Sequence, residues 1–120
     1  AKLDAGTEAY FHQVDGTRFS FQRVLDNISW ASKQAPLTLQ CMFHEINGKG
    51  PSSEEIGSWI KRIEYLLEDG GDLAEVQVYT VARKPADPSV SPLSRSELDQ
   101  IAQRLENAKV PLQLKISVHG

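Results

Sequence analysis

The apolar positions of the chain predict helices that alternate with short strands. From 21 to 31 the apolar residues stand three or four positions apart, which is the spacing of one helix face. Ser20 before this stretch is a good N-cap, and Pro36 ends the helix. The same spacing returns from 56 to 67 and from 98 to 105. A serine with a glutamate three residues later, the spacing of a capping box, precedes each of these stretches: Ser52 with Glu55, and Ser94 with Glu97.

Segments without helical spacing lie between these helices and predict strands. Residues 37–43 are apolar and almost uncharged, as a buried strand is, and residues 76–82 have the same character. From 112 to 118 apolar and polar residues alternate, which predicts a further strand with one buried face. Residues 1–4 are too few to identify as a strand alone. Because a turn and a short helix from 7 to 14 follow them, we interpret them as the C-terminal end of one.

This order of elements predicts an α/β fold in which parallel strands alternate with helices through right-handed crossovers. One strand-helix unit takes about 30 residues, so a chain of 120 residues holds about four units. A closed barrel of this type needs roughly 200 residues or more. We therefore expect a single domain, residues 1–120, folded as a partial (βα) TIM-type barrel (a half barrel) or as a small open sheet.

Composition narrows the classes of partner. Lys and Arg total 13 against 16 Asp and Glu, for a net charge of −3, which argues against a nucleic-acid partner because such binding depends on clustered cations. No apolar run approaches the roughly 20 residues of a membrane span, so we expect no membrane partner. Cys41 is the single cysteine and cannot form an internal disulfide or, alone, a four-thiolate metal site. We expect a reducing, cytoplasmic setting, with Cys41 buried in its apolar strand as a small hydrophobe.

Isolated residues give weak chemical signals. Trp30 and Trp59 occupy helical positions and are predicted to pack in the core. His12, His44 and His119 are far apart in the sequence, and no metal site is predicted from them.

Polar residues follow the predicted strand ends. Ligands of parallel α/β folds bind beyond the carboxyl ends of the strands, so these residues should converge on one rim. A ligand site and a merely solvated rim both fit this spacing. The rim residues are Asp4, Glu8, His44, Glu45, Asn47, Arg83, Lys84 and His119.

Three stretches resemble, in the same order, segments of the radical S-adenosylmethionine (radical SAM) enzymes. Residues 2–8, Lys-Leu-Asp-Ala-Gly-Thr-Glu, followed by Phe11, resemble the fourth-strand segment of that superfamily. Residues 40–55, which begin Gln-Cys-Met-Phe, are similar to the fifth strand and its helix. Residues 78–98, which begin Val-Tyr-Thr-Val-Ala-Arg-Lys-Pro-Ala, resemble the sixth strand and last helix of a bacterial subgroup.

The resemblance implies a partial (βα)6 barrel in which S-adenosylmethionine lies across the strand ends. A [4Fe–4S] cluster cleaves it reductively, and the resulting 5′-deoxyadenosyl radical abstracts hydrogen from a substrate. This chain lacks the three-cysteine loop and the Gly-Gly-Glu string of the family, both of which belong to the first half of such a barrel. It therefore resembles the C-terminal half of the catalytic barrel of an iron-sulfur oxidoreductase of unknown substrate. We expect the 120-residue chain alone to hold no cluster, to bind S-adenosylmethionine only weakly or not at all, and to be inactive.

The resemblance also implies cofactor-binding residues. Lys2 takes the place of the fourth-strand residue that faces the cofactor in relatives, and Asp4 lies two residues further on. Gln40 and Met42 alternate toward one face of the next strand, and Tyr79 does so in the strand after it. The alternative for Met42 and Tyr79 is that each simply fills the barrel interior.

Substrate binding and partners complete these expectations. Arg83, one of the rim residues, is the candidate for binding substrate. The chain does not begin with methionine, which favours a piece of a longer protein whose N-terminal half of the barrel is the missing partner. We expect the fragment to form a homodimer that buries the inner sheet faces or pairs edge strands, because its inner sheet face and its two sheet edges would be left open. That face carries either Leu39, Cys41 and Phe43 or the alternate residues Thr38, Gln40 and Met42.

A second reading of the sequence stays open. The chain fits a small standalone α/β binding or interaction module without catalysis, which shares only the strand-helix pattern with the radical SAM enzymes.

Overall fold

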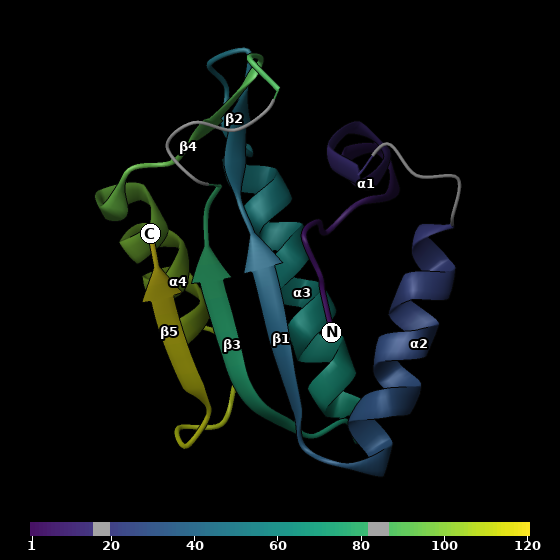
Figure 1. Cartoon of the computed structure of the whole chain (residues 1–120). Coiled ribbons are helices and arrows are strands. Elements are labelled where there is room, and N and C mark those ends of the chain that lie inside the picture. The colour runs from purple at the N-terminus through teal and green to yellow at the C-terminus, as the bar shows by residue number, and fades with distance from the viewer. Residues whose placement is uncertain (16–19, 82–86) are drawn as a thin grey trace.

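The computed structural model describes residues 1–15, 20–81 and 87–120, in which helices and strands alternate along the chain (Figure 1). In chain order the elements are α1 (Glu8–Asp15), α2 (Phe21–Gln34), β1 (Leu37–Met42), β2 (His44–Ile46), α3 (Ser53–Glu68), β3 (Leu73–Tyr79), β4 (Val90–Pro92), α4 (Arg95–Glu106) and β5 (Lys115–His119).

The main sheet is parallel, with strand order β1-β3-β5. Residues at the N-terminus extend it beyond β1, because Lys2 forms a parallel bridge with Gln40. The Leu3 amide donates to the Gln40 carbonyl at 3.1 Å, and the Gln40 amide donates to the Ala1 carbonyl at 2.8 Å. The interpretation of residues 1–4 as the end of a strand fits this pairing. Across the sheet, the strands therefore lie side by side in the order in which they occur in the sequence.

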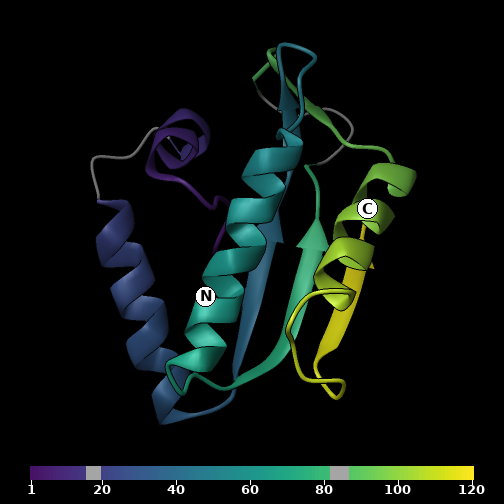
Figure 2. The same cartoon turned by 180° about the vertical axis from the view of Figure 1, so that it is seen from behind.

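The helices cover one face of this sheet. Helices α3 and α4 lie behind the strands in Figure 1 and in front of them in the reverse view of Figure 2, while α2 runs along the side of the N-terminal segment. No helix of the described residues lies over the opposite face. The predicted α/β fold with parallel strands is confirmed, and the described strands form an open sheet rather than a closed barrel.

The core lies between the sheet and α3 and α4. The predicted stripes of both helices are confirmed, since these side chains are buried: Ile56, Trp59, Ile60, Ile63 and Leu66 of α3, and Leu98, Ile101, Ala102 and Leu105 of α4. Trp59 packs edge to face on Phe43, with ring centroids 5.0 Å apart. Cys41 is fully buried, as predicted. The prediction for Trp30 is wrong: its position on α2 faces outward and leaves it 67% exposed.

The N-terminal segment is fixed to α3 by polar contacts. The buried Glu55 carboxylate accepts hydrogen bonds from the Gly6 amide and the Thr7 hydroxyl, and Arg62 donates to the Gly6 carbonyl at 3.0 Å. Ser52 caps α3 as expected, by accepting from the Glu55 amide. The Glu55 side chain, however, turns to Gly6 and Thr7, whereas Glu97 completes the predicted box with Ser94.

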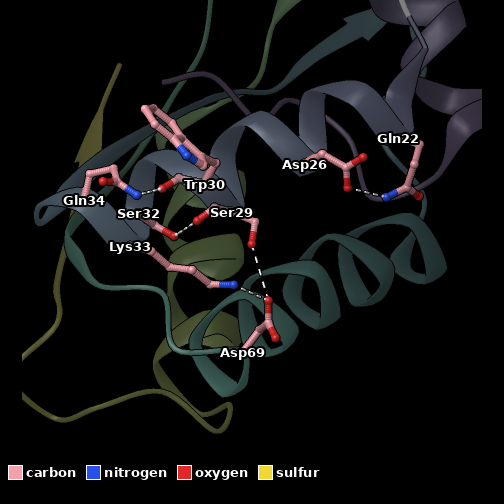
Figure 3. A network of polar contacts seen from close by, with 8 residues as sticks. All are labelled: Gln22, Asp26, Ser29, Trp30, Ser32, Lys33, Gln34 and Asp69. Carbon is pink, nitrogen blue, oxygen red and sulfur yellow. Dashed lines mark hydrogen bonds and ion pairs between the residues drawn. The ribbon is translucent and has the colours of Figure 1, made fainter.

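Among the polar contacts in Figure 3, those made by Ser29 and Lys33 with Asp69 join helix α2 to the end of α3. Lys33 forms an ion pair with Asp69 at 2.8 Å, and Ser29 donates to the same carboxylate at 3.4 Å. The Lys33 ammonium lowers the pKa of Asp69. These contacts are exposed and lie at the end of the molecule opposite the carboxyl ends of the strands.

Three strand predictions need correction. Residues 44–46 and 90–92 form a small antiparallel ribbon, β2 with β4, which the sequence did not predict. Strand β3 begins three residues earlier than expected, because Glu75 lies on the uncovered face and tolerates solvent, and it ends at Tyr79, whereas Thr80 and Val81 were expected to continue it. The last strand begins only at Lys115, and Leu112 before it is fully exposed.

Candidate functional site

The uncovered side of the sheet, which we call the open face, is the candidate site. Alternate residues of a strand point to opposite sides, so the partners of the buried positions lie on this face. The paired registers bring these residues together in three rows across the strands. The open face consists of Lys2, Asp4, Thr38, Gln40, Met42, Glu75, Gln77, Tyr79, Lys115, Ser117 and His119.

The structure brings the five candidate cofactor-binding residues together on the open face. Lys2 lies beside Gln40 through the parallel bridge, and Met42 is in register with Tyr79. Asp4 joins them because its Oδ1 accepts from the Met42 amide at 2.9 Å. Arg83, the candidate for substrate binding, lies outside the described residues, as does Lys84.

Asp4 is the most buried carboxylate of the open face, with a side chain that is 10% exposed. Lys2 Nζ lies 3.6 Å from its Oδ2. Burial raises the pKa of Asp4, while the Met42 amide and the Lys2 ammonium act in the opposite direction. Asp4 also borders a cavity of about 170 Å³ with the apolar side chains Phe11, Phe21 and Val24. Because burial makes the charged form of Asp4 unfavourable, binding of a ligand that brings a cation or a hydrogen-bond donor to this carboxylate is favoured.

Hydrogen bonds join the remaining polar side chains of the open face. Gln40 donates to Gln77 at 3.2 Å, which links β1 to β3. Glu75 accepts from the Ser117 hydroxyl at 2.6 Å, and Ser117 Oγ lies 2.9 Å from His119 Nε2. The Ser117 hydrogen bond is the main cause of a lowered pKa of Glu75. Sequence reasoning placed His119 at the rim but missed Glu75 and Ser117, whose signal was the polar alternation along β3 and β5.

The rim beyond the strand ends is built by the β2–β4 ribbon. Ser91 of β4 donates to Glu45 of β2 at 2.9 Å. A cavity of about 620 Å³ lies between this ribbon, the ends of β3 and β5, and the start of α4, and Glu45, Thr80 and Arg95 help to line it. His44 Nδ1 is buried and makes no hydrogen bond within the described part of the chain.

The rim residues converge only in part. Asp4 and His119 reach the open face, and Glu45 reaches the large cavity. Glu8 instead faces His12 on the same helix at 3.5 Å, and Asn47 lies in the tight turn that follows β2, with a positive φ of 51°.

A metal centre has no donor set among the described residues. No group of three or more His, Cys, Asp or Glu side chains comes together there. Burial raises the pKa of the Cys41 thiol strongly, which disfavours the thiolate that an iron-sulfur cluster needs. The described residues do not fit such a cluster.

Two further findings concern the similarity of the chain to known proteins and its helices as candidate membrane spans. No family model, curated protein or solved structure matches the chain. Within residues 1–15, 20–81 and 87–120, no helix has the length and apolar character needed to cross a bilayer.

Proposed function

We propose that this chain is the C-terminal half of the catalytic barrel of a radical SAM enzyme, and that the open face is the wall on which cofactor and substrate lie. The observation that carries the proposal is the one-sided sheet. Its strands are parallel and lie in sequence order, and α3 and α4 cover one face only. A doubly wound sheet has helices on both faces, whereas each strand-helix unit of a (βα) barrel has its helix outside.

The chemistry of the open face supports S-adenosylmethionine as its ligand. Lys2 offers an ammonium to a carboxylate, and its side chain is 58% exposed. Asp4 offers a carboxylate to an amine or to ribose hydroxyls, and Met42 and Tyr79 offer apolar surface to a flat base. When bound in the complete barrel, S-adenosylmethionine would supply the hydrogen-abstracting chemistry. The residues of this chain would bind and orient it, and the cluster would be held by the other half.

Binding to the 120-residue chain tests the proposal. Because the chain would supply only part of the binding site, it should bind S-adenosylmethionine weakly, with a millimolar dissociation constant that corresponds to a binding free energy of about −4 kcal/mol. Two-dimensional NMR should show shifts confined to the open face around Lys2, Asp4, Gln40, Met42 and Tyr79. Lys2→Ala should weaken these shifts, and Lys115→Ala, which removes an exposed lysine from the opposite strand of the same face, should not.

Two outcomes would count against the proposal. Shifts on the helical face only would remove the open face as the binding wall. A micromolar constant abolished by Asp4→Ala would indicate a complete site within this chain. Reading the gene upstream of Ala1 is an independent check, since the proposal requires the three-cysteine loop to be encoded there.

The standalone module remains the second candidate because the polar side chains of the open face bond to one another. The Gln40–Gln77 and Glu75–Ser117 hydrogen bonds satisfy groups that would otherwise need a partner. A start codon near Lys2 would favour this candidate.

A further inference from the structure

Glu75, Ser117 and His119 form a chain of hydrogen bonds across β3 and β5 whose direction the chemistry fixes. Ser117 Oγ lies 2.6 Å from Glu75 Oε2 and 2.9 Å from His119 Nε2. A hydroxyl has one proton, and an ionised carboxylate can only accept. Ser117 therefore donates to Glu75 and accepts from a protonated His119 Nε2.

This arrangement leaves the other imidazole nitrogen, Nδ1, able to accept a proton. When Nε2 carries the hydrogen of a neutral His119, Nδ1 carries a lone pair. Nδ1 makes no hydrogen bond to the described residues, and His119 is exposed. A proton taken up at Nδ1 creates an imidazolium that still donates to Ser117, with the Glu75 charge one hydrogen bond further on.

The charged and titratable groups around Glu75 and His119 are compatible with proton uptake at Nδ1. The Ser117 hydrogen bond and the Lys115 ammonium, 3.8 Å from Glu75, keep that carboxylate ionised by lowering its pKa. Tyr79 is in register with His119 on β3 and is a further titratable group beside it. The side chains of α4 lie on the opposite face of the sheet.

We propose that Glu75, Ser117 and His119 form an acid-base site on the open face, with His119 Nδ1 as the proton acceptor and Ser117 and Glu75 as positioning residues. Its ligand would carry an acidic O–H, N–H or activated C–H bond. That bond breaks, the proton goes to Nδ1, and the electron pair stays on the ligand. The imidazolium then returns the proton to the ligand or to water. Neither an oxidant nor S-adenosylmethionine takes part, so this site stands apart from the proposed function.

The ring opening of 5-nitrobenzisoxazole tests the acceptor, because a base that removes the carbon-bound proton of this probe opens the ring to a coloured phenolate. With the complete 120-residue chain, His119→Gln should lower the rate about a hundredfold, the low end of what a positioned base contributes. Glu75→Gln and Ser117→Ala should lower it in the same direction. Equal rates for wild type and His119→Gln would overturn the proposal.

Ser91→Ala is the matched control, because Ser91 also donates to a glutamate but lies on the β2–β4 ribbon. It should leave the rate unchanged. A loss as large as that of Ser117→Ala would assign the effect to general destabilisation and overturn the specific role of Ser117.

A titration of the Glu75 carboxyl by NMR tests the positioning step without any ligand. Ser117→Ala should raise the pKa of Glu75 toward its ordinary value of 4.5, and Ser117→Thr, which keeps the hydroxyl, should restore the lowered value. An unchanged pKa in Ser117→Ala would show that the hydrogen bond does not form. Because these measurements use no S-adenosylmethionine, their failure is distinguishable from failure of the proposed function.

Discussion

Asp4 holds a carboxylate where burial opposes its charge. Its pKa is raised from the ordinary value of 3.8, so the folded chain binds a proton here more tightly than the unfolded chain does. The stability from this group is therefore fully present below pH 3.8 and is lost as the pH rises through the raised pKa. The charged form of Asp4 therefore lowers the free energy of unfolding near neutral pH.

Asp4→Asn removes this titration and keeps an oxygen that can accept from the Met42 amide. We expect the variant to gain stability relative to wild type as the pH rises from below 3.8 to neutral, measured by urea unfolding at both pH values. Asp69→Asn is a control of opposite sign, because Lys33 lowers the pKa of Asp69. A difference between Asp4→Asn and wild type that does not change with pH would contradict the argument.

Cys41 should behave as an inert core residue. Its side chain is fully buried and its thiol pKa is raised by burial, so a disulfide reagent should label it only after unfolding. Anaerobic treatment with iron and sulfide should leave the chain colourless. A stable iron-sulfur absorbance that scales with the protein and survives Cys41→Ala would refute this prediction.

Because Gly6 has no side chain, the N-terminal segment can approach α3 closely. A Cβ atom on Gly6 would overlap the backbone of Trp59, which cannot move without distorting the helix. We expect Gly6→Ala to lower the free energy of unfolding by about 3 kcal/mol, the upper end for an overpacked site. Denaturant unfolding followed by circular dichroism measures this change.

Gly57 is a matched control within α3. A Cβ there meets only the flexible end of Arg104, at 3.3 Å. Alanine is the better helix former by about 1 kcal/mol, so Gly57→Ala should be neutral or stabilising. Comparable losses in Gly6→Ala and Gly57→Ala would rule out the close approach as the cause.

The sequence predicted the helices better than the strand ends, for physical reasons. Capping serines and apolar stripes fix α3 and α4 locally. The start of β3 was predicted three residues too late because buried strands are apolar on both faces, whereas Glu75 near its start lies on the open face. The β2–β4 ribbon left no signal, since its three-residue strands pair His44 with Pro92 far along the chain.

The residues of the candidate site were likewise predictable only in part. Alternation placed Gln40 and Met42 on one strand face, and the resemblance supplied Lys2, Asp4 and Tyr79. The contact of Ser117 with Glu75 depends on the register of β3 with β5, which periodicity does not specify.

At the scale of the whole molecule, the open face and the sheet edge have different characters. Of the two possible faces of β1, the one that carries Thr38, Gln40 and Met42 belongs to the open face, which is therefore largely polar. The outer edge of β5 has no partner strand among the described residues. An unpaired edge promotes association more directly than a hydrogen-bonded polar face.

We therefore expect a two-fold dimer that pairs the β5 edges at high concentration. Light scattering behind a sizing column, run across a wide range of concentration, measures the mass. A single species of 13.3 kDa at every concentration would contradict the dimer and favour the standalone module.

The sequential parallel order of the strands also determines how the chain reaches its native state. Paired residues such as Lys2 and Gln40, Leu37 and Leu73, and Glu75 and Lys115 all lie far apart in the sequence. No hairpin can start this sheet, so long loops must close before any of its hydrogen bonds forms. During synthesis β1 has no neighbour on one side until β3 has emerged from the ribosome. Because the hydrogen bonds of a helix are local, we expect the helices to form before the strands pair.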